Sequence, residues 1–399
     1  MRMLHVIEAV LFFYLFFRLV LLLPARRPFK AAAAFVLLLA TQQHLLTRLF
    51  FGSLASPDLP RPVLMTQSLL LVSCLLLFLT ILLRDAALLV RGVLRRVRRR
   101  LGGGGLPESD VCPGDKRSDA PSGSGFSQGR RFFLLSCPAV LAAVYGLRRA
   151  VEVPRVRETQ CLLPGLPAEL DGLRIAHVSD LHIGPLLLRP WTEAVVDAVN
   201  ALKPDLVVLT GDIVDGLPAQ RAESVAPLRQ LRARCGVFAC AGNHEYYSDF
   251  RAWMRAFSSL GTDMLLNEGR VLNIGGRQLY LAGVTDIAAA RFSLPQPDCA
   301  AAAGGAPQTA VRVLLAHRPI TAAAAAAAGF DLQLSGHTHG GQILGLQRIV
   351  AEFNAGYLYG WYAIRGMRLY VSSGAGLWNG FPVRLGVPSE IAHITLRRA

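Results

Sequence analysis

The most informative stretch of this 399-residue chain is Leu332-Gln-Leu-Ser335-Gly-His337-Thr-His339-Gly-Gly341. Its first four residues form a short apolar run of the length expected for a buried strand. The run ends directly in a glycine and two histidines. Glycine lets the backbone approach a ligand closely, and imidazole is a common metal ligand. The segment therefore predicts a strand that carries two histidines to a metal site.

Five other apolar runs on the same half of the chain also predict strands, namely residues 174–179, 206–210, 236–241, 311–316 and 369–372. Four of them end in polar clusters: Asp180-Leu-His182, Gly211-Asp212-Ile-Val-Asp215, Gly242-Asn243-His244-Glu245, and His317. Helical periodicity over residues 191–202 and 250–257, and an alanine run over 322–328, separate the strands. This alternation predicts an α/β domain over residues 151–399. Ligands bind at the carboxyl ends of the strands in open α/β sheets, so the clusters are expected to converge on one crevice.

The residue types in these clusters suit a pair of divalent metal ions. Carboxylate, imidazole and amide oxygen are ligands that Mn, Fe and Zn accept. Two ions about 3.5 to 4 Å apart require a bridging carboxylate, and Asp212 in a glycine-flanked turn can supply it. Asp180, Asp212 and a hydroxide would leave such a site slightly positive, which favours an anionic phosphate substrate.

With these five clusters in this order, residues 172–396 resemble the calcineurin-like metallophosphoesterase superfamily. The resemblance implies a four-layer α/β/β/α metallophosphoesterase sandwich with two bound metal ions, whose identity as Mn, Fe or Zn stays open. One ion would be held by Asp180, His182, Asp212 and His339, and the other by Asp212, Asn243, His317 and His337.

The same resemblance implies that His244 is the general acid that protonates the leaving alkoxide and that Asp215 orients it. Glu245 receives no separate role. Arg384 is expected to form a surface ion pair rather than to contact the substrate phosphate.

The expected activity is hydrolysis of a phosphomonoester or phosphodiester by a metal-bridging hydroxide. One alternative is a non-catalytic metal-binding interaction module on a membrane anchor, although such modules typically lose the catalytic histidine and His244 is present. Another is a membrane scaffold or transporter with an accessory domain.

Residues 1–150 predict a membrane region, and the domain boundary is placed between residues 150 and 151. Residues 4–24, 31–51 and 63–83 are long and apolar enough to span a bilayer as a bundle of helices, and residues 132–146 are marginal. A cleaved signal peptide is the alternative for residues 1–24, but that apolar stretch is too long. Glu8 and Arg18 lie within it, so their side chains are expected to face other helices or water rather than lipid. Residues 84–131 predict a basic, disordered loop.

The basic charge is concentrated in this region, which carries +13 of the chain's net charge of +15. Because this excess flanks apolar segments, it predicts contact with the lipid bilayer and no nucleic-acid partner. The positive-inside rule puts the basic loop in the cytoplasm. If residues 132–146 cross, the second domain is lumenal or extracellular, which is the side we favour; otherwise it is cytosolic. A lipid-linked phosphoester is the substrate that proximity to the bilayer suggests.

Overall fold

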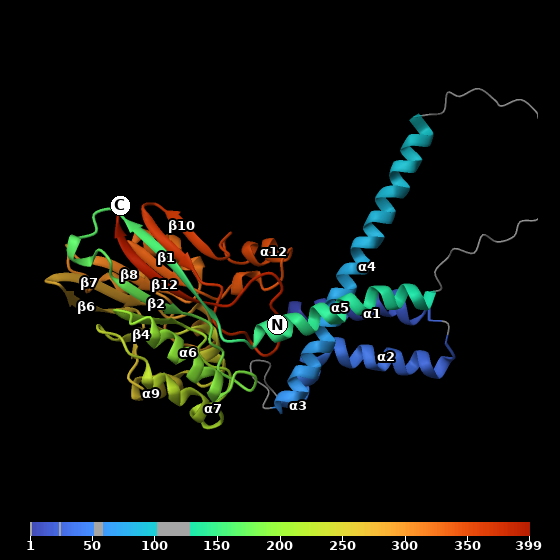
Figure 1. Cartoon of the computed structure of the whole chain (residues 1–399), viewed down its shortest axis with the longest axis horizontal. Coiled ribbons are helices and arrows are strands. Elements are labelled where there is room, and N and C mark those ends of the chain that lie inside the picture. Colours follow the sequence, from blue (N-terminus) through green and yellow to red (C-terminus); the bar gives the residue numbers. More distant parts are fainter. Residues whose placement is uncertain (1, 24, 52–58, 102–127) are drawn as a thin grey trace, which may run out of the picture. The chain divides into compact units, whose positions relative to one another are not determined.

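The computed structural model describes residues 2–23, 25–51, 59–101 and 128–399. The chain forms two compact units (Figure 1). The first consists of Met1–Leu45 and Leu69–Ala143, and the second of Leu46–Ser68 and Val144–Ala399. The second unit therefore includes a segment far upstream of residue 151, because Leu64 and other residues near it pack into its core.

Twelve strands form two mixed sheets in the described part of the second unit. The first sheet has the order β1 (Arg155–Leu163), β12 (Glu390–Arg398), β2 (Arg174–Val178), β3 (Leu206–Thr210), β4 (Val237–Cys240) and β5 (Asp263–Met264). The second has the order β10 (Gly360–Ile364), β11 (Met367–Val371), β9 (Leu332–Ser335), β8 (Val311–Leu315), β7 (Arg277–Gly283) and β6 (Glu268–Ile274). All six predicted runs are strands, so these predictions are confirmed.

The strands that carry the polar clusters lie side by side and in parallel. β2, β3 and β4 are parallel neighbours in the first sheet, and β8 and β9 are parallel neighbours in the second. Parallel strands point their carboxyl ends to one edge of the sheet, where ligand sites form. This arrangement brings the clusters of each sheet together at one edge.

Strand alternation gives each sheet two apolar faces. In β3, Leu206 and Val208 enter the core between the two sheets, whereas Val207 and Leu209 enter the core on the other side. Helices α6 (Arg189–Ala201) and α9 (Phe250–Ser259) contribute to that outer core of the first sheet.

Short helices α10 (Cys299–Ala303) and α11 (Ala322–Ala327) cover the outer face of the second sheet in the same way. The helices predicted at residues 191–202, 250–257 and 322–328 are thus confirmed. The unit is a mixed α/β fold in which helices flank a pair of packed sheets.

The first unit is helical. It is built from α1 (Arg2–Leu15), a π-helix (Phe16–Val20), α2 (Arg27–Thr41) and parts of α3 (Gln43–Phe51), α4 (Arg61–Leu101) and α5 (Gln128–Ala150). Among the described residues, one helical stretch, Arg61–Arg98, is long and apolar enough to cross a membrane. A second would count if α2 and α3, which meet at a bend of 69°, form one span. The predicted bundle of transmembrane helices is therefore not confirmed and stays a prediction.

The ionisable residues of the first apolar stretch contact residues of other helices in this unit, in line with the expectation that they face helices or water. The Glu8 carboxylate lies 2.5 Å from Nδ1 of His44, and both residues are buried. Arg18 donates a hydrogen bond of 2.5 Å to Asp85. Such pairing lowers the cost of placing charged groups among apolar helices.

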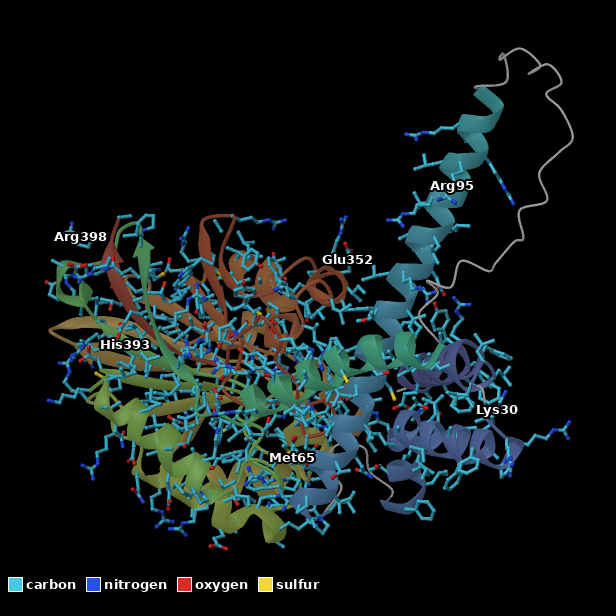
Figure 2. The ribbon with its side chains drawn as sticks, turned by 45° about the vertical axis from the view of Figure 1, so that its right-hand side comes forward. Lys30, Met65, Arg95, Glu352, His393 and Arg398 are labelled. Atoms are coloured by element: carbon cyan, nitrogen blue, oxygen red, sulfur yellow. The ribbon has the colours of Figure 1, made fainter. Side chains whose placement is uncertain are left out.

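The predicted disordered loop over residues 84–131 is wrong at both ends. Helix α4 continues to Leu101 and α5 begins at Gln128, while residues 102–127 lie outside the described residues. Arginine, leucine and alanine have high helix propensity, so the arginine-rich stretch prolongs the helix instead of ending it. Figure 2 labels Arg95 on this basic extension of α4.

Candidate metal centre

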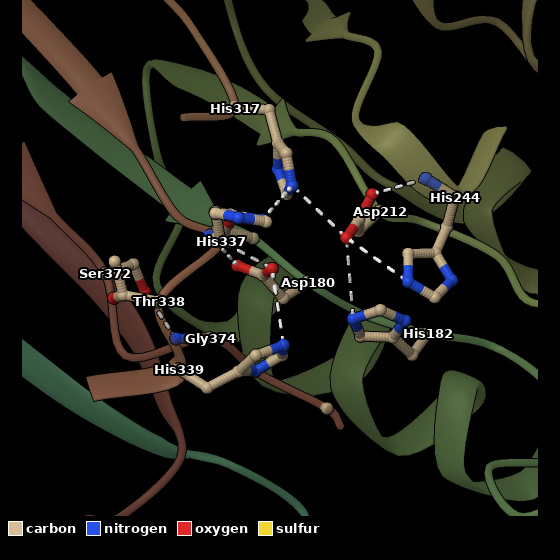
Figure 3. A network of polar contacts seen from close by, with 12 residues as sticks. Asp180, His182, Asp212, His244, His317, His337, Thr338, His339, Ser372 and Gly374 are labelled. Atoms are coloured by element: carbon tan, nitrogen blue, oxygen red, sulfur yellow. Dashed lines mark hydrogen bonds and ion pairs between the residues drawn. The ribbon is translucent and has the colours of Figure 1, made fainter. Parts of the chain in front are cut away.

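Every residue that the sequence predicts for the site lies in a loop or short helix that follows one of the parallel strands, and Figure 3 shows most of them around one centre. Their side chains form three overlapping groups whose ligand atoms lie within 4.8 Å of one another. The groups are Asp180, His182 and His339; His182, Asp212 and His244; and Asp212, His317 and His337. His182 and Asp212 each belong to two groups, so the three groups are continuous.

Asp212 is at the middle of this set. Its Oδ1 accepts a hydrogen bond of 2.8 Å from the backbone N–H of His244. Its Oδ2 lies 3.2 Å from Nε2 of His317 and 3.8 Å from Nε2 of His182. Burial alone would raise the pKa of Asp212, but the imidazoles of His317 and His244 hold it well below the usual range. One oxygen of an ionised carboxylate therefore faces several imidazoles at once.

The first ligand group lies on one side of Asp212. His339 Nε2 lies 3.6 Å from Asp180 Oδ1, and both residues are buried. His182 directs its Nδ1 to Asp215, at 3.2 Å, which leaves its buried Nε2 without a hydrogen-bond partner. A carboxylate behind an imidazole fixes the tautomer with a free lone pair on the opposite nitrogen.

The second ligand group lies on the other side. Nδ1 of His317 is 2.8 Å from the backbone oxygen of Thr210, and Nε2 of the same ring is 3.2 Å from Nδ1 of His337. Asn243 is buried on the first turn of α8 (Asn243–Tyr247). Its Oδ1 accepts a hydrogen bond of 2.7 Å from Arg318, which also contacts His337.

His244 and Asp215 form a short pair, with Nδ1 of the imidazole 2.6 Å from Oδ1 of the carboxylate. Burial lowers the pKa of His244, but Asp212 and Asp215 outweigh burial and raise it to about 9. The other ring nitrogen, Nε2, lies 4.0 Å from Asp212. His244 thus directs its second ring nitrogen toward the candidate metal ligands. Asp215 orients two imidazoles rather than the one that the sequence indicated, because the same oxygen also lies 3.2 Å from Nδ1 of His182.

Five of the predicted ligands adopt a left-handed backbone conformation that side chains other than glycine rarely adopt. The φ angles are 54° for Asp180, 45° for His182, 50° for Asp212, 72° for His337 and 48° for His339. Such strained residues cluster at functional sites, where the surrounding structure maintains them. The strain indicates that the fold places these side chains for a function other than packing.

Two glycines allow the backbone to pass close to the carboxylates of Asp180 and Asp212. A Cβ on Gly242 would lie 2.3 Å from Oδ1 of Asp212, and a Cβ on Gly336 would lie 2.2 Å from Oδ2 of Asp180. Only glycine fits at either position. Together with the unpartnered Nε2 of His182 and a donor set of nitrogen and oxygen atoms, this cradle fits divalent metal ions.

Glu245, to which the sequence assigned no role, holds the ligand loops together. Its buried carboxylate accepts hydrogen bonds from the backbone N–H groups of Asp212, Ile213, Val214 and Gly242, at 3.0, 2.7, 3.3 and 2.7 Å. The sequence signals only the contact with Gly242, because a glutamate three residues after a helix-capping position commonly accepts the N–H of that position.

Replacing Glu245 with Gln is expected to lower the free energy of unfolding by about 2–4 kcal/mol, because an amide NH₂ would be turned toward buried N–H donors. Urea denaturation followed by tryptophan fluorescence would measure the change. The exposed Glu223→Gln on α7 (Pro218–Val225) is the matched control and should leave stability unchanged. Equal stabilities of the two variants would contradict this role of Glu245.

The expected surface ion pair of Arg384 is wrong. The side chain is buried, and its guanidinium donates to the backbone oxygens of Ser373, Gly374 and Gly376 at 2.8 to 3.0 Å. Burial lowers the pKa of Arg384 to about 10. By donating to three carbonyl oxygens, this arginine fixes the loop that follows β11. The sequence did not indicate this role, because backbone acceptors are not visible in a sequence pattern.

Comparisons with known proteins identify the family to which this chain belongs. The sequence pattern of the calcineurin-like phosphoesterase family matches residues 173–341. A Danio rerio protein named transmembrane protein with metallophosphoesterase domain is 33% identical over 341 residues, which cover 83% of this chain and 74% of that protein. The Bos taurus protein of the same name is 36% identical over 269 residues, which cover 64% of this chain and 60% of that protein.

The chain belongs to the calcineurin-like metallophosphoesterase family. The family resemblance drawn from the sequence is therefore confirmed. Among solved structures, a Thermus thermophilus sulfate thiohydrolase aligns with a TM-score of 0.37 and 15% identity, over 53% of each chain. The relatives named above are called transmembrane proteins, and this chain has one or two apolar helices of spanning length among its described residues.

Proposed function

We propose that this protein is a membrane-anchored phosphoesterase that uses two divalent metal ions. The observation that carries the proposal is the position of Asp212 Oδ2, which is 3.2 Å from Nε2 of His317 and 3.8 Å from Nε2 of His182. A carboxylate oxygen shared by two ligand groups is what a bridged pair of ions requires. Asp180, His182, Asp212 and His339 would hold one ion, and Asp212, Asn243, His317 and His337 the other.

The bound ions would neutralise phosphate charge and activate water as the nucleophile. The chain itself supplies the rest of the chemistry. Asp215 accepts a hydrogen bond from Nδ1 of His244, which aims the other ring nitrogen at the cluster. The raised pKa of His244 keeps that nitrogen protonated near neutral pH, so it can donate a proton to the leaving oxygen.

The second part of the proposal is the setting of the site. We place the first unit in the lipid bilayer as a multi-pass anchor, with the phosphoesterase domain on the lumenal or extracellular side. Support comes from the apolar helices, the arginines that flank them and the positive-inside rule. A lipid-linked phosphoester is the proposed substrate. Protease protection of an epitope at Ala399 in sealed microsomes tests the side, and digestion without detergent would contradict it.

The test of activity uses purified full-length protein supplied with Mn²⁺, the diester bis-p-nitrophenyl phosphate and the monoester p-nitrophenyl phosphate. We expect hydrolysis of at least one of them, and its loss after chelation. Absence of hydrolysis of both, together with stoichiometric metal binding, would favour the non-catalytic binding module instead. Absence of metal binding as well would contradict both functions.

A further inference from the structure

We propose that Arg318 makes the two metal positions unequal, because it occupies the ligands of the second position and must release them before an ion binds there. This inference rests on the proposed two-metal function. It concerns a residue that directly follows His317 and that no sequence pattern singled out.

The guanidinium of Arg318 is held at three points. Its Nε donates 2.9 Å to Oδ2 of Asp286, a buried carboxylate that caps the short 3-10 helix Ile287–Phe292. One terminal nitrogen donates 2.7 Å to Oδ1 of Asn243, and the other contacts Nε2 of His337 at 2.8 Å. Asp286 thus orients the fork of the guanidinium onto two proposed ligands of the same ion.

The contact with His337 determines whether Arg318 strengthens or weakens metal binding at the second position. Arginine has only donors, so Nε2 of His337 must accept its hydrogen bond. A neutral imidazole that accepts at Nε2 carries its proton on Nδ1. Nδ1 is the nitrogen that faces the cluster, 3.2 Å from Nε2 of His317. The lone pair of Nδ1 becomes available to a metal ion only after the arginine contact is released, because the ring proton can then reside on Nε2 instead.

The positive charge of Arg318 also weakens metal binding at the second position. The guanidinium carries a permanent positive charge within hydrogen-bond distance of two ligands, and it repels a divalent cation that approaches them. In the first ligand group, by contrast, Nε2 of His182 is buried without a hydrogen-bond partner. The first position is therefore ready for an ion, whereas the second requires a cation to be displaced.

The experiment is a calorimetric titration of Mn²⁺ into metal-stripped full-length protein in detergent. Wild type is expected to bind two ions with clearly different affinities. Arg318→Met should tighten the weaker site about tenfold or more and leave the tighter site unchanged, since charged hydrogen bonds and a repulsive charge are removed. Arg318→Lys, which keeps the charge but lacks the fork, should tighten it less. Arg291→Met, which removes a nearby exposed charge, is the control and should change neither site.

The outcomes separate this inference from the proposed function. If wild type binds no Mn²⁺, the two-metal function itself is contradicted. If wild type binds two ions equally tightly, or if Arg318→Met weakens the second ion or leaves it unchanged, the inference is overturned and the function stands. Circular dichroism checks that each variant is folded. Should Arg318→Met not fold, the wild-type and Arg318→Lys titrations still decide the question.

Discussion

Replacing Asp212 with Asn is expected to reduce phosphoesterase activity by about 10³-fold or more, because an amide cannot provide the charged oxygen that several imidazoles surround. Oδ2 of Asp212 lies within 4.0 Å of Nε2 of His317, His182 and His244, so one substitution disturbs both proposed metal positions. Metal content should fall from two ions per chain to one or none. Elemental analysis and the p-nitrophenyl phosphate assays measure the two effects.

The control for Asp212→Asn is Asp197→Asn on the exposed face of α6, which removes a similar charge away from the site. It should keep wild-type activity and metal content. An Asp212→Asn protein that retains two ions and most of its activity would show that Asp212 does not bridge them.

Replacing His244 with Ala is expected to lower kcat by about 10²–10⁴-fold while the protein keeps its bound metal. The size of the loss should depend on the leaving group. An alkyl phosphoester releases a basic alkoxide that needs a proton, whereas p-nitrophenolate leaves readily without one. We therefore expect a large loss with an alkyl ester and a much smaller one with p-nitrophenyl phosphate.

The control for His244→Ala is His393→Ala, since His393 is also buried but pairs with Glu158 on β1, away from the ligand loops. It should affect neither kcat nor its dependence on the leaving group. Equal losses with both leaving groups in His244→Ala would exclude a general acid, and a loss of metal would indicate a ligand instead.

The strands and the order of the polar clusters were predictable because both follow from local patterns. A short apolar run that ends in glycine and a metal-ligating side chain predicts both a strand and a ligand position from about ten neighbouring residues. The run ending in His337 and His339 and the run ending in Asp212 are examples, and both are strands in the structure. The predicted loop over residues 84–131 begins too early because the arginine-rich stretch ahead of the Gly- and Ser-rich segment favours a helix, and α4 continues to Leu101.

The contacts around the ligands could not be predicted, because they join segments far apart in the chain. Arg318 donates a hydrogen bond to Asn243, which lies 75 positions away in the sequence, and Glu245 accepts hydrogen bonds from backbone N–H groups 31 to 33 positions away. Arg384 was misassigned for the same reason, since its acceptors are backbone oxygens that every sequence contains.

The sequence alone determined which atoms this protein offers to a metal, because ligand chemistry belongs to residue types and to their places at the ends of strands. Only the tertiary structure decided which of those atoms contact one another and how the contacts shift their pKa values. Packing the two sheets face to face brings one carboxylate among several imidazoles, and it places a guanidinium against an asparagine and a histidine. Burial strengthens each of these contacts by excluding water, and burial arises only when the whole chain has folded.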